Sequence, residues 1–343
     1  MAAPRLTARR HTPARPARCP PPPRAAAWAP AVAADTPFAA AASGEWDGML
    51  VTYDAKGEAQ ELPPSVVPAA FREWEVSVRD WQTQCSTVVD GSGVLRYRLR
   101  RLVREESEKR GRAASPQRRR ARPAHPLTSL QLPSVGCEAD ATAFVDAEVA
   151  GLGGAGDPPA TADGSFVLAP PALAPGAAVE HCLATAPGRR VRLRIVVGGA
   201  GSRESPFFAA RTELHRETFD SPFRGGETLA GCGGSVPQFA GAAALEGAAL
   251  DGGGWVVADE KAWAATAAGL ARAEPSPDPA SGSDPGRLLL PDAWVAVRPG
   301  EGGRVTVEGG VAARAGERRV AAATFAPGGA LEAVRLATET RPA

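Results

Sequence analysis

Residues 44–53, with the sequence Gly-Glu-Trp-Asp-Gly-Met-Leu-Val-Thr-Tyr, constrain the fold of this chain more than any other segment. Trp46 follows a Gly-x entry, apolar side chains then alternate, and a turn at residues 54–57 ends the run. Alternation with a period of two places successive side chains on opposite faces of a β-strand. A bulky indole at the start of such a strand is suited to plug one end of a β-barrel. We therefore predict that the ordered part of the chain opens with a barrel strand.

Strand-like runs continue along the chain between turns rich in glycine and proline. The 343 residues include 38 Gly and 33 Pro, a composition that argues against a helical bundle. Arg192 and Arg194 alternate with apolar residues, which is the pattern of a sheet with one face in solvent. We predict an all-β, antiparallel barrel fold with few short helices, of which residues 259–271 form the main one. The predicted strands after the first are residues 94–100, 142–149, 164–168, 179–184, 190–197, 207–218, 304–308, 318–325 and 331–341.

Two short segments repeat at an offset of 122 residues. Residues 164–168 resemble residues 286–290, and residues 214–218 resemble residues 336–340. A second Gly-x-Trp, which ends at Trp255, also leads into a pair of valines. Two tandem barrel-like units would explain these similarities, as would a single barrel of biased composition. We predict the tandem arrangement, with units at residues 39–222 and 223–343.

The first 34 residues differ in composition from the rest of the chain. They contain six Arg and no Asp or Glu, and they are rich in Ala and Pro, so they cannot build a core. This composition is typical of an organelle transit peptide, with an ordinary disordered tail as the alternative. We predict that residues 1–38 are disordered and direct the protein to the chloroplast stroma.

The charge and hydropathy of the remaining chain exclude two classes of partner. Beyond the arginine-rich start, acidic residues outnumber basic ones, which argues against nucleic-acid binding. No apolar run approaches the ~18–20 residues that a membrane-spanning helix needs. We therefore expect no nucleic-acid partner and no transmembrane segment.

Residues 103–132 interrupt the strand pattern. Residues 103–131 carry eight basic and three acidic side chains and few apolar ones, so we predict a disordered insertion. Its origin stays open between a real loop and an intron retained in the coding sequence. Valine codons begin with GT and one glutamine codon is CAG, which are common intron edges. A basic RNA-binding arm is the weaker alternative, because no aromatic side chains lie among the arginines.

Motifs for catalysis are nearly absent from the chain. There is no G-x-S-x-G, no P-loop and no H-E-x-x-H. The cysteines form no C-x-x-C pair, so we expect no metal site. Outside the N-terminal segment and the insertion, His181 and His215 could each be a general base or a buried strand residue. We predict no catalytic residues.

Aromatic and arginine residues make a ligand-binding site the stronger expectation. Trp46, Trp74 and Trp81 lie close in sequence, and they could fill the core or line a cavity against a flat ligand. Charged residues gather near the end of a predicted strand, where an arginine could bind a ligand carboxylate or form a salt bridge that closes the barrel. The predicted ligand-binding residues are Trp46, Trp74, Trp81, Arg216 and Arg224.

Motifs spread over the chain carry a family likeness: Gly44-Glu-Trp46-x-Gly48-(x4)-Tyr53, Phe71-Arg-Glu-Trp74, Asp80-Trp81-Gln-Thr-Gln-Cys85-Ser86, Asp220-Ser-Pro-Phe223, Gly231-Cys-Gly-Gly234 and the hairpin 318–341. With these motifs the chain resembles a plant and algal plastid family of uncharacterised proteins with a calycin, or lipocalin-like, fold. The same fold resembles the cyanobacterial bilin chromophore lyases, which hold linear tetrapyrroles in an open barrel. The resemblance implies no agreed activity, so any cofactor is unknown and no catalytic residue carries over.

These features together predict a non-enzymatic plastid protein. Its barrel would bind a hydrophobic small molecule or pigment, apolar or tetrapyrrole-like. Alternatively, it would assist the assembly of photosynthetic complexes with protein partners. The remaining alternative is an enzyme of the lyase or isomerase type that acts on a bound pigment or lipid. In that case His215 and Asp220 would serve as acid and base.

Overall fold

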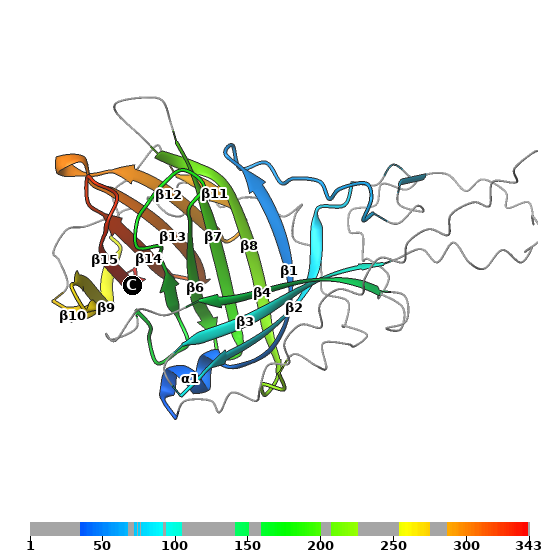
Figure 1. Cartoon of the computed structure of the whole chain (residues 1–343), viewed down its shortest axis with the longest axis horizontal. Coiled ribbons are helices and arrows are strands. Elements are labelled where there is room, and N and C mark those ends of the chain that lie inside the picture. The colour runs from blue at the N-terminus through cyan, green and yellow to red at the C-terminus, as the bar shows by residue number, and fades with distance from the viewer. Residues whose placement is uncertain are drawn as a thin grey trace, which may run out of the picture. The chain divides into compact units, whose positions relative to one another are not determined.

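The computed structural model of the chain is built almost wholly of β-strands in the part that it describes (Figure 1). The strands form two antiparallel sheets, accompanied by a short α-helix. The prediction of an all-β, antiparallel fold is confirmed, and two sheets are consistent with two barrel-like units. The described residues are 35–67, 72–73, 75, 77–91, 94–104, 141–150, 159–199, 207–225, 254–274 and 287–341.

The first sheet contains eight strands in the order β4-β3-β2-β1-β8-β7-β6-β5. Strands that are consecutive in the chain pair with each other, except that β4 and β5 lie at opposite edges. The last strand, β8, returns to pair with β1. This is the order of an up-and-down barrel that is open at one seam. The strands are β1 (Gly44–Asp54), β2 (Asp80–Val89), β3 (Leu95–Arg104), β4 (Ala141–Ala150), β5 (Phe166–Leu168), β6 (Ala178–Ala186), β7 (Arg189–Gly199) and β8 (Phe207–Ser221).

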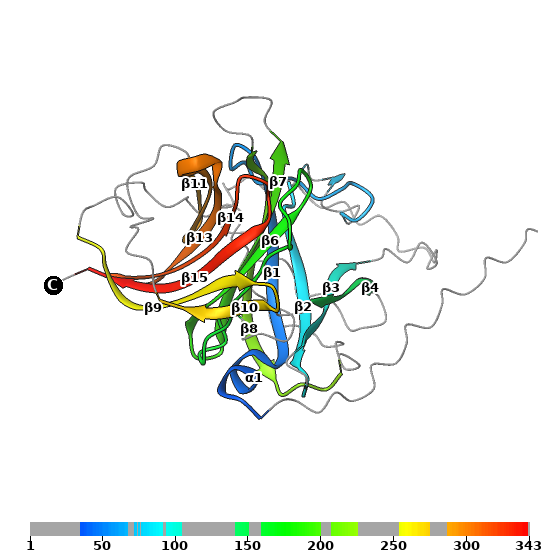
Figure 2. The same ribbon diagram turned by 60° about the vertical axis from the view of Figure 1, so that its left-hand side comes forward.

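The second sheet contains seven strands in the order β10-β9-β15-β14-β13-β12-β11. Here too the last strand returns to the first, because β15 pairs antiparallel with β9 (Figure 2). The open seam falls between β10 and β11, so both sheets follow the same rule of connection. The strands are β9 (Val256–Thr266), β10 (Gly269–Ala273), β11 (Leu288–Leu290), β12 (Ala293–Pro299), β13 (Val305–Arg314), β14 (Glu317–Phe325) and β15 (Leu331–Thr340).

The two sheets bury one apolar face each against a shared core. Val51, Leu193 and Leu214 reach this core from the first sheet, and Val307 and Val334 reach it from the second. All five are at most 1 % exposed. Burying a side chain of this size contributes ~1.5–3 kcal/mol, so this face fixes the register of each strand. The opposite face of each sheet is then available for other roles.

The α-helix, α1 (Pro37–Ala42), lies at one end of the first sheet (Figure 1). The hydroxyl of Thr36 caps it by accepting the Ala39 N–H at 3.1 Å, and proline suits the first helical position. Phe38 packs edge-on against Phe166, with the ring centroids 6.2 Å apart. The helix begins inside the predicted disordered segment 1–38, of which residues 1–34 lie outside the described residues.

The predicted helix at residues 259–271 is wrong, because this region forms β9, a turn and β10. Its alanines favour a helix in isolation. However, β9 pairs with β15 along one edge and with β10 along the other, and Trp263 is fully buried in the shared core. These contacts outweigh helix-propensity differences that amount to less than ~0.7 kcal/mol per residue.

The predicted insertion, residues 103–132, begins later than expected. β3 continues to Arg104, which lies opposite Ala141 of β4 in an antiparallel pair. The first two residues of the predicted insertion therefore belong to a strand. The rest of it lies outside the described residues.

Candidate functional site

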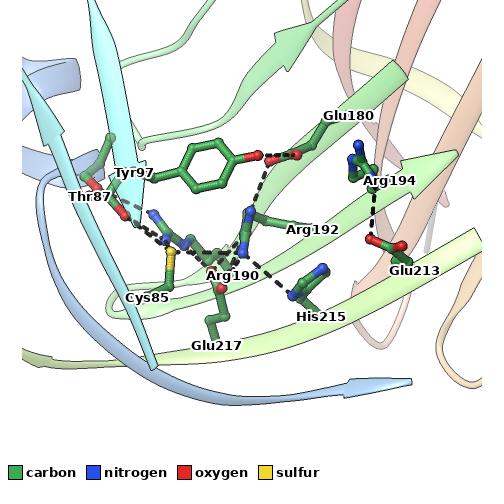
Figure 3. A network of polar contacts seen from close by, with 11 residues as sticks. Cys85, Thr87, Tyr97, Glu180, Arg190, Arg192, Arg194, Glu213, His215 and Glu217 are labelled. Atoms are coloured by element: carbon green, nitrogen blue, oxygen red, sulfur yellow. Dashed lines mark hydrogen bonds and ion pairs between the residues drawn. The ribbon is translucent and has the colours of Figure 1, made fainter. Parts of the chain in front are cut away.

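The face of the first sheet that points away from the shared core carries a cluster of polar side chains. The sheet curls so that β3 passes in front of β6–β8 (Figure 1), and β2 and β3 thereby contact β6 and β7. Figure 3 shows the resulting network, which we call the arginine network. Its core members are Cys85, Thr87, Tyr97, Glu180, Arg190, Arg192, His215 and Glu217.

Glu217 is the centre of the arginine network. It accepts Arg190 Nε at 2.6 Å and Arg192 Nη2 at 2.7 Å, and all three side chains are at most 3 % exposed. Arg192 also donates to Glu180 at 3.0 Å, whose other oxygen accepts the Tyr97 hydroxyl at 3.2 Å. Two arginines and two glutamates thus balance in charge. Buried charges are tolerated when they are paired and hydrogen-bonded in this way.

Arg190 connects the arginine network to the end of the sheet. Its Nη2 donates to the Thr87 hydroxyl at 2.9 Å, and its Nη1 donates to the carbonyl of Ala42 in α1 at 3.3 Å. The guanidinium carbon lies 3.8 Å from the ring centroid of Trp46. Arg190 therefore makes hydrogen bonds, an ion pair with Glu217 and a cation–π contact, all within the protein. These interactions occupy its guanidinium, so we do not assign it a ligand.

Burial and charge set the protonation states within the network. Burial raises the pKa of Glu217, but Arg190 and Arg192 outweigh it and hold that pKa well below its usual range. Burial, together with the charge of Arg192, holds the pKa of His215 well below 6.5. Burial also raises the pKa of the Cys85 thiol to about 11. None of these groups is poised to exchange a proton near neutral pH, so the arginine network is suited to structure and not to acid–base catalysis.

The prediction that the arginine side of residues 190–197 faces solvent is wrong for part of the strand. The side chain of Arg192 is 3 % exposed, whereas that of Arg194 is 32 % exposed. Alternation separates the two faces of a strand, but it does not tell which face other strands cover. Here the curled strands β2 and β3 cover the arginine side.

A cavity of about 470 Å³ lies beside the arginine network, and we call it the Trp46 cavity. Its wall combines the aromatic rings of Trp46 and Phe219 with small residues of α1 and of the β6–β7 hairpin, among them Ala40 and Ala184. Small side chains leave this space open. Cavities of this size accept small organic molecules.

Trp46 gives the cavity part of its aromatic wall. Its side chain is 4 % exposed, and its Nε1 has no hydrogen-bond partner among the described residues. Phe219 meets Trp46 edge-to-face at 5.5 Å and is itself 40 % exposed. The pair offers an accessible aromatic surface beside a buried donor.

The cavity wall also carries charged side chains, of which one pair joins the two sheets. Arg319 of β14 donates to Asp163, in the turn before β5, at 3.1 Å. Arg189, at the start of β7, also lines the cavity and is exposed. Within the part of the chain that the structure describes, Arg189 has no ion pair. The wall therefore combines apolar side chains with charged ones, of which Arg189 is exposed.

The structure separates the predicted tryptophans. Trp46 lines the cavity, and its role in ligand binding stays a prediction. Trp81 is 9 % exposed and packs in a different apolar cluster, against Leu50 of the neighbouring strand. Trp74 lies outside the described residues.

The predicted arginines and the alternative acid–base pair lie away from the Trp46 cavity. Arg216 donates to Asp292, beside the second sheet, at 2.6 Å. Arg224 is exposed at the end of β8. His215 is buried in the arginine network, whereas Asp220 is exposed five residues further along the chain. The structure does not bring His215 and Asp220 into one site.

The second sheet repeats the arrangement of Trp, Arg and Glu. Trp255 precedes β9, and the guanidinium of Arg318 lies 4.3 Å from its ring centroid. Arg318 in turn pairs with Glu339 at 2.6 Å. Arg318 lies directly opposite Glu339 in strand register, as Arg190 lies opposite Glu217 in the first sheet. The offset of the predicted repeat also aligns these two glutamates.

The two sheets differ two residues beyond the aligned glutamates. Phe219 occupies that position in the first sheet and meets Trp46 edge-to-face. Arg341 occupies it in the second sheet, with its guanidinium 4.7 Å from the ring centroid of Trp255. Two cations therefore lie against Trp255, whereas Trp46 combines one cation with an aromatic neighbour and a cavity.

Comparison with known proteins finds similarity to a solved structure. A solved structure from Nostoc punctiforme, described as a protein with unknown function from the DUF3598 family, is similar with a TM-score of 0.44 and 14 % sequence identity. The match covers 89 % of this chain and 98 % of that chain. No protein-family model matches the chain, and no curated protein matches it. The resemblance to a plastid family and to bilin lyases stays a prediction.

Among the described residues, no helix is long and apolar enough to cross a membrane.

Proposed function

We propose that this protein is a non-enzymatic binding protein that holds a small, largely apolar ligand in the Trp46 cavity. The observation that carries the proposal is the Trp46 cavity itself, which has a volume of about 470 Å³ and is walled in part by the rings of Trp46 and Phe219. The arginine network is a less suitable ligand site, because Arg190 and Arg192 are already paired with Glu217 and Glu180.

Ligand affinity would come mainly from apolar burial. Each ~100 Å² of ligand surface removed from water contributes about 2.5 kcal/mol before ordering costs. The aromatic pair of Trp46 and Phe219 suits a conjugated ring such as that of a pigment, and the alanines of the wall suit an aliphatic chain. A pigment, an isoprenoid or an acyl chain would fit this chemistry.

Native purification followed by mass spectrometry and absorbance tests the proposal. The full chain should release a stoichiometric small molecule on denaturation. Ala184→Phe should reduce the bound fraction at least tenfold, because it fills the cavity from β6. Ala178→Phe, at the other end of the same strand, is the matched control and should retain the ligand. Equal ligand content in both variants would place the ligand elsewhere, and an empty protein with bound protein partners would favour an assembly role.

The proposed compartment is the chloroplast stroma. It rests on the arginine-rich, acid-free composition of residues 1–34. A fluorescent protein fused after the full chain should enter plastids, and the same fusion that lacks residues 1–38 should stay in the cytosol. Plastid import of the shortened fusion would contradict the proposal.

A further inference from the structure

Donors and acceptors are unevenly available on the wall of the Trp46 cavity. Asp163 is already engaged through both carboxylate oxygens. One oxygen accepts the Thr161 hydroxyl and the Ser165 N–H, and the other accepts Arg319 at 3.1 Å. The acid of this wall therefore has little to offer a cationic ligand.

One donor on the same wall is open to a ligand, namely the guanidinium of Arg189. The Trp46 N–H also has no partner among the described residues, but it is itself buried. The exposed guanidinium of Arg189 faces no acid within the described ranges, whereas the neighbouring Arg190 is neutralised by Glu217 at 2.6 Å. An open cation favours ligand oxygens that carry negative charge.

We infer that the ligand of the Trp46 cavity is an amphipathic anion, with its apolar part against Trp46 and Phe219 and its carboxylate or sulfonate beside Arg189. The inference rests on the proposed function and adds the charge of the ligand to it. A neutral ligand of the same shape gains the apolar burial but leaves Arg189 without a counter-charge.

Two fluorescent probes separate charge from shape. Anilinonaphthalene sulfonate and N-phenylnaphthylamine share one aromatic framework, and only the first carries a sulfonate. Titration of the full chain should give a Kd about fivefold lower for the sulfonate, since an ion pair at an exposed arginine contributes little more than that. Decanoate should displace the sulfonate probe more effectively than decanol does.

Single substitutions locate the preference. Arg189→Gln should remove it, so that the two probes bind with the same Kd. Arg211→Gln is the matched control, because it removes the same charge from a half-exposed arginine that already pairs with Glu213. A preference that survives in Arg189→Gln, or that is equally lost in Arg211→Gln, overturns the inference.

The outcomes for the inference and for the proposed function differ. Equal affinity for both probes, lost in Ala184→Phe, overturns the anionic ligand and leaves the cavity as a binding site. Probe binding that Ala184→Phe leaves unchanged overturns the proposed function itself. A sulfonate preference lost in both Arg189→Gln and Ala184→Phe supports the two together.

Discussion

His181 provides a sharp test of the shared core. It lies on β6, is fully buried, and neither ring nitrogen has a hydrogen-bond partner among the described residues. Val167 and Leu193 flank it in register on the neighbouring strands. Gly309 approaches it from the second sheet, where an added Cβ would lie 2.6 Å from the Nδ1 of His181. None of these neighbours is charged or titratable, and burial alone lowers the pKa of His181 to about 3.

This lowered pKa makes the free energy of unfolding depend on pH. The unfolded chain binds a proton at this histidine below an ordinary pKa of about 6.5, whereas the folded chain does not until pH approaches 3. The contribution of the neutral ring is therefore complete above about pH 6.5 and is lost as pH falls below it. At 1.36 kcal/mol per pH unit, the loss amounts to about 2 kcal/mol at pH 5.

His181→Leu should remove this dependence. Urea unfolding followed by tryptophan fluorescence should show the variant gaining about 2 kcal/mol on the wild type between about pH 7.5 and pH 5. Any packing strain from leucine shifts the difference equally at every pH. Thr212→Val is the control, because Thr212 is equally buried in the first sheet, its hydroxyl lacks a partner among the described residues, and it does not titrate. A difference between His181→Leu and wild type that stays constant with pH would refute the reasoning.

Two further predictions concern the opposite faces of the sheets. Glu217→Gln should lower the free energy of unfolding by ~3–5 kcal/mol, because it removes the negative charge that neutralises the buried guanidiniums of Arg190 and Arg192. Glu213→Gln, on the same strand but partly exposed, should cost less than ~1 kcal/mol, and similar losses in urea unfolding would contradict the network. Gly310→Ala should cost ~1–3 kcal/mol, since its Cβ would enter the buried ring of Trp294. Gly328→Ala meets no neighbour within 4 Å and should leave thermal unfolding within ~0.5 kcal/mol of wild type.

The strands were predictable because burial on one face imprints a period of two on the sequence. Residues 190–197 and 318–325 correspond closely to β7 and β14. The same rule failed at residues 259–271, where alanines on both faces hide the alternation and only Trp263 and Leu270 mark the buried side. Pairing with β15, which lies about 70 residues away in the chain, decides the structure there. Such a long-range contact leaves no local signal.

The arginine network was not predicted, although parts of its signal are present in the sequence. Arg190 and Arg192 occupy alternate positions on β7, and Glu217 lies on the strand that follows. Their pairing depends on register, and their burial depends on β2 and β3 curling over them. Neither the register nor the curl follows from residue types alone. The strand that carries Trp46 was predictable, because a Gly-x-Trp entry followed by alternating apolar residues is a local signal.

The energetics of the first sheet favour a ligand in the Trp46 cavity over a ligand in the arginine network. The sequence suggested a ligand inside the barrel, but the inward side of the curled sheet holds the arginine network. A ligand that displaced Glu217 from Arg190 and Arg192 would forfeit ~3–5 kcal/mol of buried ion pairing. To recover about 4 kcal/mol it would have to bury an additional ~160 Å² of apolar surface. At the end of the sheet, beside Trp46, a ligand meets no such cost, because Arg319 can stay paired with Asp163 and Arg189 has no ion pair among the described residues to lose.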